Sequence, residues 1–200
     1  MNKNEKEIEI KVKVKNVDKL ITFLKKNGKF DKEKHQIDEY FIPAHRDFTN
    51  IRPINEWLRL RTEDGEYSLN YKNWHREADG KSHFCDEYES AVEHLDQVKK
   101  IFEAVNMKSI VTVDKRRKVW NYKNYEVSID SVKELGDFVE LEYKNHEDSR
   151  QPELITEEMT TFLETVGCTD IEKNYQGYPF LLMFGDEAKF EKQKEKEQIL

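Results

Sequence analysis

Three residue types are scarce in this chain of 200 residues. Seven glycines and four prolines are too few for a loop-rich or low-complexity protein. The two cysteines, Cys85 and Cys168, lack the spacing of a metal site. We expect reduced, semi-buried thiols in a cytoplasmic protein, with a disulfide between them as the alternative. No apolar run approaches membrane-spanning length and the polar N-terminus has no signal-peptide core, so we expect no membrane association.

Basic charge is also in deficit. The formal net charge of −7 leaves no surplus of cations to neutralise a phosphate backbone, which argues against a general nucleic-acid binder. One small polyphosphate held in a local basic pocket remains compatible with this charge. Hydrophobic residues make up 36% and aromatic residues 12%, which is enough for a globular core.

The first strong pattern is an alternation near the N-terminus. Residues 7–15 place Ile8, Ile10, Val12 and Val14 on one face of a strand and charged residues on the other. The apolar row needs cover, so we expect it to lie under helices. The charged row would face either solvent or an enclosed polar cavity.

The rest of the chain predicts one α+β domain over residues 1–184, followed by a charged tail at 185–200 that is helical or disordered. The expected strands are 7–15, 35–42, 56–62, 66–73, 82–90, 108–120, 123–130 and 137–144, and the expected helices are 17–27, 91–105 and 153–166. Hairpin turns at 63–66 and 121–124 favour antiparallel pairing. The helix at 91–105 has an apolar stripe that we expect to be buried, and the aromatic segment 171–184 should pack back on the body.

Several of these strands carry charges of both signs on their polar face. The charged positions are Glu7, Glu9, Lys11, Arg59, Arg61, Lys72, Glu87, Glu89, Lys115, Arg117, Asp130, Glu140 and Glu142. Closing the sheet with its apolar face outward under helices gives an eight-stranded antiparallel β-barrel, a tunnel with a charged lumen. For any single strand an ordinary solvated face is the better explanation. Eight strands that share this alternation of apolar and charged residues favour the tunnel.

Such a lumen suits a polyphosphate with a divalent metal. Carboxylates on neighbouring strands are suitable oxygen ligands for Mg²⁺ or Mn²⁺, which commonly share them with substrate phosphates. Lysine and arginine on the remaining wall can neutralise phosphate oxygens, arginine in bidentate fashion.

These residues resemble the CYTH proteins, also called triphosphate tunnel metalloenzymes, and among them the class IV adenylate cyclases. The signature Glu-x-Glu-x-Lys is met by Glu7, Glu9 and Lys11. Further segments are similar in family order over roughly residues 5–180: 35–41, 46–48, 58–61, 71–72, 115–117, 128–130 and 135–142. The C-terminal end departs from the family, because residues 174–178 stand where a Ser-Tyr and a basic residue are usual. Lys173 would supply the missing charge.

The resemblance implies a role for each matched position. Glu7, Glu9 and Glu140 would be metal ligands, supported by Glu142 and Asp130. The triphosphate would be held by Lys11, Arg59, Arg61, Lys72, Lys115 and Arg117, of which Lys11, Lys115 and Arg117 would also be catalytic. Glu87 or Glu89 would order the basic residues or a metal-bound water. For Glu142 and Arg61, charge pairing within the lumen is an equal alternative.

The similarity of residues 46–48 to the cyclase branch favours an adenylate cyclase. In that reaction the ribose 3′-hydroxyl of ATP attacks the α-phosphorus and pyrophosphate leaves. The alternative is a triphosphatase that hydrolyses inorganic, thiamine or nucleoside triphosphate. A non-catalytic nucleotide- or polyphosphate-binding module is the third hypothesis. Related cyclases suggest a homodimer, and nothing in the composition contradicts it.

Overall fold

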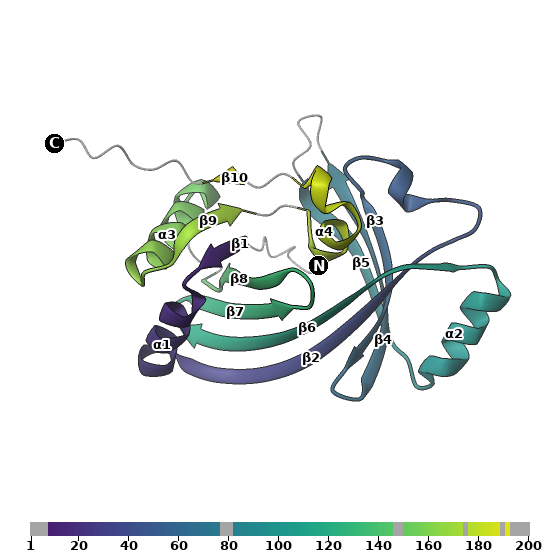
Figure 1. Ribbon diagram of the computed structural model, residues 1–200, viewed down its shortest axis with the longest axis horizontal. Coiled ribbons are helices and arrows are strands. Elements are labelled where there is room, and N and C mark those ends of the chain that lie inside the picture. The colour runs from purple at the N-terminus through teal and green to yellow at the C-terminus, as the bar shows by residue number, and fades with distance from the viewer. Residues whose placement is uncertain (1–7, 77–81, 146–149, 174–175, 189–190, 193–200) are drawn as a thin grey trace. The chain divides into compact units, whose positions relative to one another are not determined.

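The computed structural model describes residues 8–76, 82–145, 150–173, 176–188 and 191–192 (Figure 1). The chain forms two compact units. The first comprises residues 1–33, 116–177 and 186–200, and the second comprises residues 34–115 and 178–185. Two long strands, β2 (Lys29–Ile42) and β6 (Lys108–Tyr122), have residues in both units.

The first unit is an antiparallel sheet with two helices. Its further strands are β1 (Ile8–Lys15), β7 (Tyr125–Val132), β8 (Gly136–Tyr143), β9 (Thr169–Lys173) and the short β10 (Glu191–Lys192). Its helices are α1 (Val17–Asn27) and α3 (Pro152–Thr165). Strand β8 pairs with β1 on one side and with β7 on the other, and β9 pairs with the second edge of β1.

The apolar row of β1 is buried under helices, which confirms the prediction from its alternation. Ile10, Val12 and Val14 pack in one cluster with Leu20 and Leu24 of α1. The same cluster contains Ile155, Met159 and Leu163 of α3 and the inward residues Val127, Ile129, Val139 and Leu141 of β7 and β8. The opposite face of these strands is therefore the one that carries the charges.

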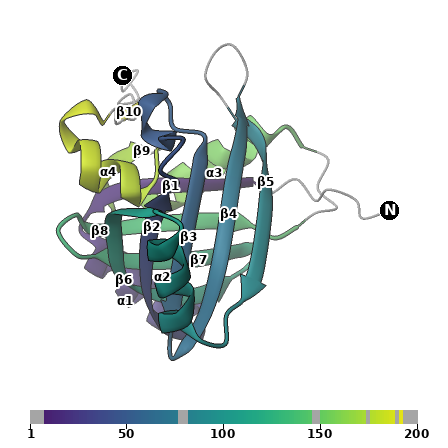
Figure 2. The same ribbon diagram turned by 90° about the vertical axis from the view of Figure 1, so that its right-hand side faces the viewer.

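The second unit contains a three-stranded meander. Its further elements are β3 (Glu56–Glu63), β4 (Glu66–Arg76), β5 (Ser82–Ala91), α2 (Leu95–Ala104), α4 (Tyr178–Phe184) and the single turn η1 (Phe48–Asn50). Figure 2 shows β3, β4 and β5 as neighbouring strands. The predicted turn between β3 and β4 is present. Asp64 and Gly65 both have positive φ, 50° and 92°, as a type I′ hairpin requires.

Hydrogen bonds link the strands in the order β10-β9-β1-β8-β7-β6-β2-β3-β4-β5. Within the described part of the chain this order is linear, so hydrogen bonds do not close the sheet. The α+β class with a large antiparallel sheet is confirmed, but the closed eight-stranded barrel is not. Two strands, β9 and β10, and the helix α4 add to the predicted elements. They arise from segments that were expected only to pack back on the body or to form a charged tail.

The prediction of a buried stripe on the second helix is wrong. No residue of α2 is buried: the stripe residues Leu95, Val98 and Phe102 are half-buried, and Val105, which follows the helix, is 60% exposed. Phe102 contacts Phe41 of β2, with ring centroids 5.0 Å apart. Helical spacing defines an apolar stripe, but it does not determine how much of the protein packs over that stripe.

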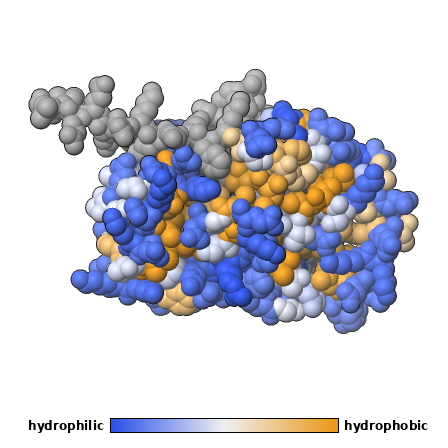
Figure 3. All heavy atoms as spheres, viewed as in Figure 1, coloured by the Kyte–Doolittle hydropathy of each residue, from blue (hydrophilic) through white to orange (hydrophobic). Residues whose placement is uncertain are grey.

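The face seen in Figure 3 is largely hydrophilic, as expected for a chain in which 38% of the residues are charged. Hydrophobic residues gather in patches on the same face (Figure 3). In the residues that the structure describes, no helix is both long enough and apolar enough to cross a membrane.

Candidate functional site

The polar face of the first unit carries a chain of four charged side chains. Lys11 of β1 lies opposite Glu140 of β8, and its Nζ is 2.8 Å from Glu140 Oε2. Arg117 of β6 donates to the two oxygens of Glu140 at 3.3 and 3.2 Å. It also donates to both oxygens of Asp130 on β7, each at 2.7 Å. One arginine therefore joins two carboxylates, with a lysine attached to one of them.

The four charged side chains need their partners because they are largely buried. Asp130 is only 1% exposed, and a buried carboxylate is costly unless it is paired; Arg117 supplies a bidentate partner. Burial lowers the pKa of Lys11, but the carboxylates of Glu140 and Glu9 outweigh it, so that this pKa is raised overall. Lys11 is accordingly a fixed cation at neutral pH.

A row of three glutamates crosses the same face. In the strand register, Glu9 of β1 is opposite Glu142 of β8, which is opposite Glu126 of β7. Lys144 lies 2.6 Å from Glu142 and 3.8 Å from Glu126. Like charges directly opposite each other destabilise a sheet, so the donor chemistry of this row fits a hard divalent cation. Among the described residues, no group of three or more acidic, histidine or cysteine side chains is already arranged to hold a metal ion.

The second unit repeats the pairing of arginine with a buried aspartate. Asp38 of β2 is opposite Arg61 of β3 and accepts from its Nε and Nη2 at 2.6 and 2.7 Å. Arg59 Nη1 donates to the same carboxylate at 3.2 Å. Burial raises the pKa of Asp38, but the guanidinium groups of Arg61 and Arg59 outweigh it, so that this pKa is lowered. One carboxylate thus holds two arginines on a single face.

Strands β4 and β5 extend this face with two further contacts. Lys72 Nζ lies 2.9 Å from Glu87 Oε2, and Asn70 donates to Glu87 at 2.7 Å. Desolvation raises the pKa of Glu87, but the hydrogen bonds from Lys72 and Asn70 outweigh it and lower the pKa overall. Ser68 Oγ donates to Glu89 at 2.9 Å. Each glutamate therefore holds side chains of β4 in place.

Lys115 of β6 gives the second unit a buried cation. It is 6% exposed, and its Nζ lies 5.2 Å from the centroid of the Tyr178 ring. Its charge also helps to lower the pKa of Asp38.

Two buried polar atoms of the second unit, Gln36 Oε1 and Arg59 Nε, find no hydrogen-bond partner among the described residues. An unsatisfied buried donor such as Arg59 Nε is costly. An anionic oxygen would satisfy it with a charge-assisted hydrogen bond.

The loop that resembled the cyclase branch packs on the other face of β3. Arg46 Nη2 is 3.0 Å from Glu56, and its guanidinium lies over the Phe48 ring, 5.0 Å from the centroid. Glu56 and Arg59 are three residues apart on one strand, so their side chains leave it from opposite faces. The structure therefore does not bring this loop to the arginines.

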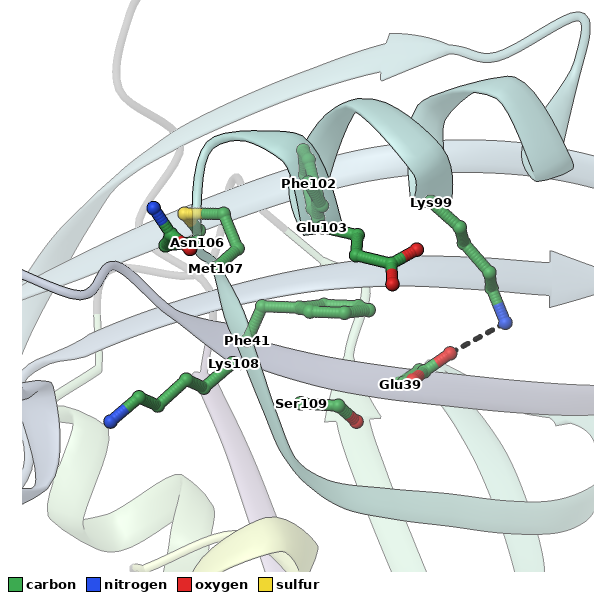
Figure 4. Close-up of a pocket in the computed structure, with 9 residues that line it drawn as sticks. All are labelled: Glu39, Phe41, Lys99, Phe102, Glu103, Asn106, Met107, Lys108 and Ser109. Carbon is green, nitrogen blue, oxygen red and sulfur yellow. Dashed lines mark ion pairs between the residues drawn. The ribbon is translucent and has the colours of Figure 1, made fainter.

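A groove of about 430 Å³ lies elsewhere in the second unit (Figure 4). It is lined by α2, the residues that follow it, and Glu39 and Phe41 of β2; Lys99 Nζ is 2.6 Å from Glu39. Glu39 and Asp38 are consecutive residues of a strand and point to opposite sides. The groove is therefore separate from the Asp38 cluster.

Most predicted site residues fall into these groups. The first unit brings together Lys11, Arg117, Asp130 and Glu140, with Glu9 and Glu142 in the adjacent row. The second unit holds Arg59, Arg61, Lys72, Glu87, Glu89 and Lys115. Glu7 lies outside the described residues.

Sequence reasoning missed Asp38, Asn70, Glu126 and Tyr178. The alternation of β7 could have revealed Glu126, because it places this glutamate on the same face as Asp130. Only the pairing register of β2 with β3 reveals the two arginine partners of Asp38.

Sequence comparison places this chain in a known family and finds a relative among curated proteins. Residues 5–178 match the CYTH domain family. A protein of Methanocaldococcus jannaschii named "Putative adenylate cyclase" is 36% identical over 173 residues, which span 84% of this chain and 95% of the relative.

Solved structures share the fold. A conserved hypothetical protein from Pyrococcus furiosus has a TM-score of 0.60 at 25% identity and covers 88% of this chain and 99% of its own. The PH1819 protein from Pyrococcus horikoshii has a TM-score of 0.65 at 22% identity, and the match covers 90% of this chain and 99% of that protein. A "Putative adenylyl cyclase" from Hippeastrum is described as having a dominant triphosphatase activity. It has a TM-score of 0.61 at 18% identity, and the match covers 92% of this chain and 97% of that protein. The last two likenesses concern the fold alone.

Proposed function

Because this chain belongs to the CYTH domain family, we propose that it is a metal-dependent enzyme acting on a triphosphate, with conversion of ATP to cyclic AMP and pyrophosphate as its reaction. The main support is the pairing of arginines with buried aspartates. Asp38 holds Arg59 and Arg61, and Asp130 holds Arg117. Such pairs fix guanidinium groups before a ligand arrives, which lowers the entropic cost of binding an anion.

In this proposal the fixed cations bind the phosphate oxygens. They are Lys11, Arg59, Arg61, Lys72, Lys115 and Arg117. Lys72, Lys115 and Arg117 would stabilise the negative charge that develops on the departing pyrophosphate, and Lys11 would neutralise the oxygens at the reacting phosphorus.

The proposal includes one divalent cofactor, Mg²⁺ or Mn²⁺. Glu9, Glu140 and Glu142 would hold it, together with Glu7. When bound, the ion would supply Lewis-acid charge stabilisation and a lowered pKa of the attacking hydroxyl. Asp130 is assigned the supporting role of positioning Arg117, because its carboxylate is 1% exposed and holds that arginine at 2.7 Å through both oxygens, whereas the Glu140 side chain is 15% exposed and lies 3.2–3.3 Å from Arg117.

Hydrolysis of a triphosphate is the second candidate, and the Hippeastrum protein's description favours keeping it. The same cations would serve water attack at the terminal phosphorus, because phosphoryl transfer depends mainly on positioning and charge stabilisation. The two reactions differ in which nucleophile is oriented.

Product analysis distinguishes the candidates. The purified protein is incubated with ATP, and separately with inorganic triphosphate, each with Mg²⁺ or Mn²⁺, and the products are resolved by anion-exchange chromatography. Cyclic AMP with pyrophosphate supports the cyclase, whereas ADP with phosphate, or cleavage of inorganic triphosphate, supports the triphosphatase. Glu9→Gln should abolish either activity, and Glu39→Gln, beside the separate groove, is the matched control. Binding of triphosphate without turnover would overturn the enzyme in favour of a binding module.

A further inference from the structure

The buried ammonium group of Lys115 lies against an aromatic ring from a distant part of the chain. Tyr178 is the first residue of α4, and its ring centroid is 5.2 Å from Lys115 Nζ. Both residues are nearly inaccessible, with 5% exposure for Tyr178 and 6% for Lys115. The contact therefore lies in a desolvated place, where the attraction between a cation and an aromatic face is strongest.

Helix α4 is anchored independently of this contact. The guanidinium of Arg52 lies 4.0 Å from the ring centroid of Phe184 and 5.7 Å from that of Phe180. Phe180 and Leu181 are buried as well. The position of the Tyr178 ring is thus set by the packing of the whole helix, and the ring can serve as a fixed surface for the ammonium group of Lys115.

We infer that Tyr178 is a positioning residue for Lys115 in triphosphate binding, an inference that rests on the proposed function. A lysine side chain has four rotatable bonds and loses much conformational entropy when its ammonium group is held at one point. Asp38 attracts Lys115 from within the charged cluster, and the Tyr178 ring provides a second, uncharged attraction. The ring restricts the ammonium group without neutralising its charge, and a positive charge at that point attracts a phosphate oxygen.

The test varies the electrons of the ring at constant shape. Tyr178 is replaced by phenylalanine and then by mono-, di- and trifluorinated phenylalanines, because each fluorine weakens the negative potential of the ring face. The dissociation constant for inorganic triphosphate is measured by titration calorimetry without turnover. Taking Tyr178→Phe as the reference, we expect affinity to fall stepwise with each added fluorine, to about tenfold weaker for the trifluorinated ring, at a Tm equal to that of the reference.

Two controls separate positioning from packing. In a Lys115→Met background the same series should have no effect on the residual affinity, because the cation is gone. Phe184→Leu weakens the anchor of α4 at Arg52 and should lower the Tm. In that background the fluorinated series should still reduce the affinity for triphosphate step by step. Equal affinities across the fluorinated series in a protein that binds triphosphate would overturn the inference alone. Absence of triphosphate binding by the parent protein would overturn the proposed function and this inference together.

Discussion

Asp38 offers the sharpest test of the paired clusters. Its carboxylate is 2% exposed and accepts three hydrogen bonds from Arg59 and Arg61 at 2.6–3.2 Å. Asp38→Asn keeps the shape of the side chain but removes the charge that both guanidinium groups need. Breaking a buried ion pair costs about 3–5 kcal/mol. For a chain of this length each kcal/mol corresponds to roughly 2–4 °C, so the Tm should fall by roughly 6–20 °C.

The pH dependence supplies a second readout of the same substitution. The pKa of Asp38 is lower in the folded protein than its ordinary value. A lowered pKa adds stability that is fully present above the unfolded-state pKa of about 3.9 and is lost as the pH falls through the folded value. The difference in unfolding free energy between the parent and Asp38→Asn should therefore be largest above pH 5 and shrink below pH 4.

Urea unfolding from pH 3 to pH 7 measures both effects. Asp170→Asn is the matched control, because it removes an exposed carboxylate 2.7 Å from Lys15 at a position whose positive φ of 49° asparagine tolerates. That variant should unfold almost like the parent, since exposed ion pairs contribute little. A parent-like midpoint and pH profile for Asp38→Asn would refute the role assigned to the buried pair.

Three further variants test other parts of the account. Arg117→Lys loses both bidentate pairs of the first unit, so kcat/KM for the triphosphate should fall roughly 10- to 100-fold; a change of less than twofold would contradict that assignment. Leu163→Ala should cost about 2–5 kcal/mol of unfolding free energy, whereas Ile101→Ala on the exposed side of α2 should change it by less than about 0.5 kcal/mol, and equal losses would contradict the packing. Burial raises the pKa of the Cys168 thiol to about 11, so in a Cys85→Ser background the folded protein should resist thiol reagents at pH 8 and react after unfolding.

Local patterns in the sequence predict much of the fold. The alternation of β1 determines which of its faces packs under α1 and α3, because a half-buried strand allows only one such arrangement. The stop at Gly28 was also predictable. A Cβ at this position would lie 3.0 Å from Leu24 O, the carbonyl that accepts its backbone N–H.

Features that depend on distant pairing were not predictable. Strand β9 is short and forms by adding to the free edge of β1, about 150 residues away in sequence. The stripe of α2 has the right period, but the cover over it depends on tertiary packing. Among the candidate site residues the charged positions could be named from the sequence. Their partners could not, because a hydrogen bond such as that of Arg61 with Asp38 depends on strand register.

The central claim is that the fixed cations of this chain act on a triphosphate with a divalent metal. Phosphorus-31 NMR tests it most directly, with ATP or inorganic triphosphate followed over time in the presence of the protein and Mg²⁺ or Mn²⁺. The account predicts that the triphosphate signals disappear, that chelation of the metal stops the reaction, and that Lys115→Met slows it strongly. Unchanged triphosphate signals for both substrates with both metals, in a folded protein, would contradict it.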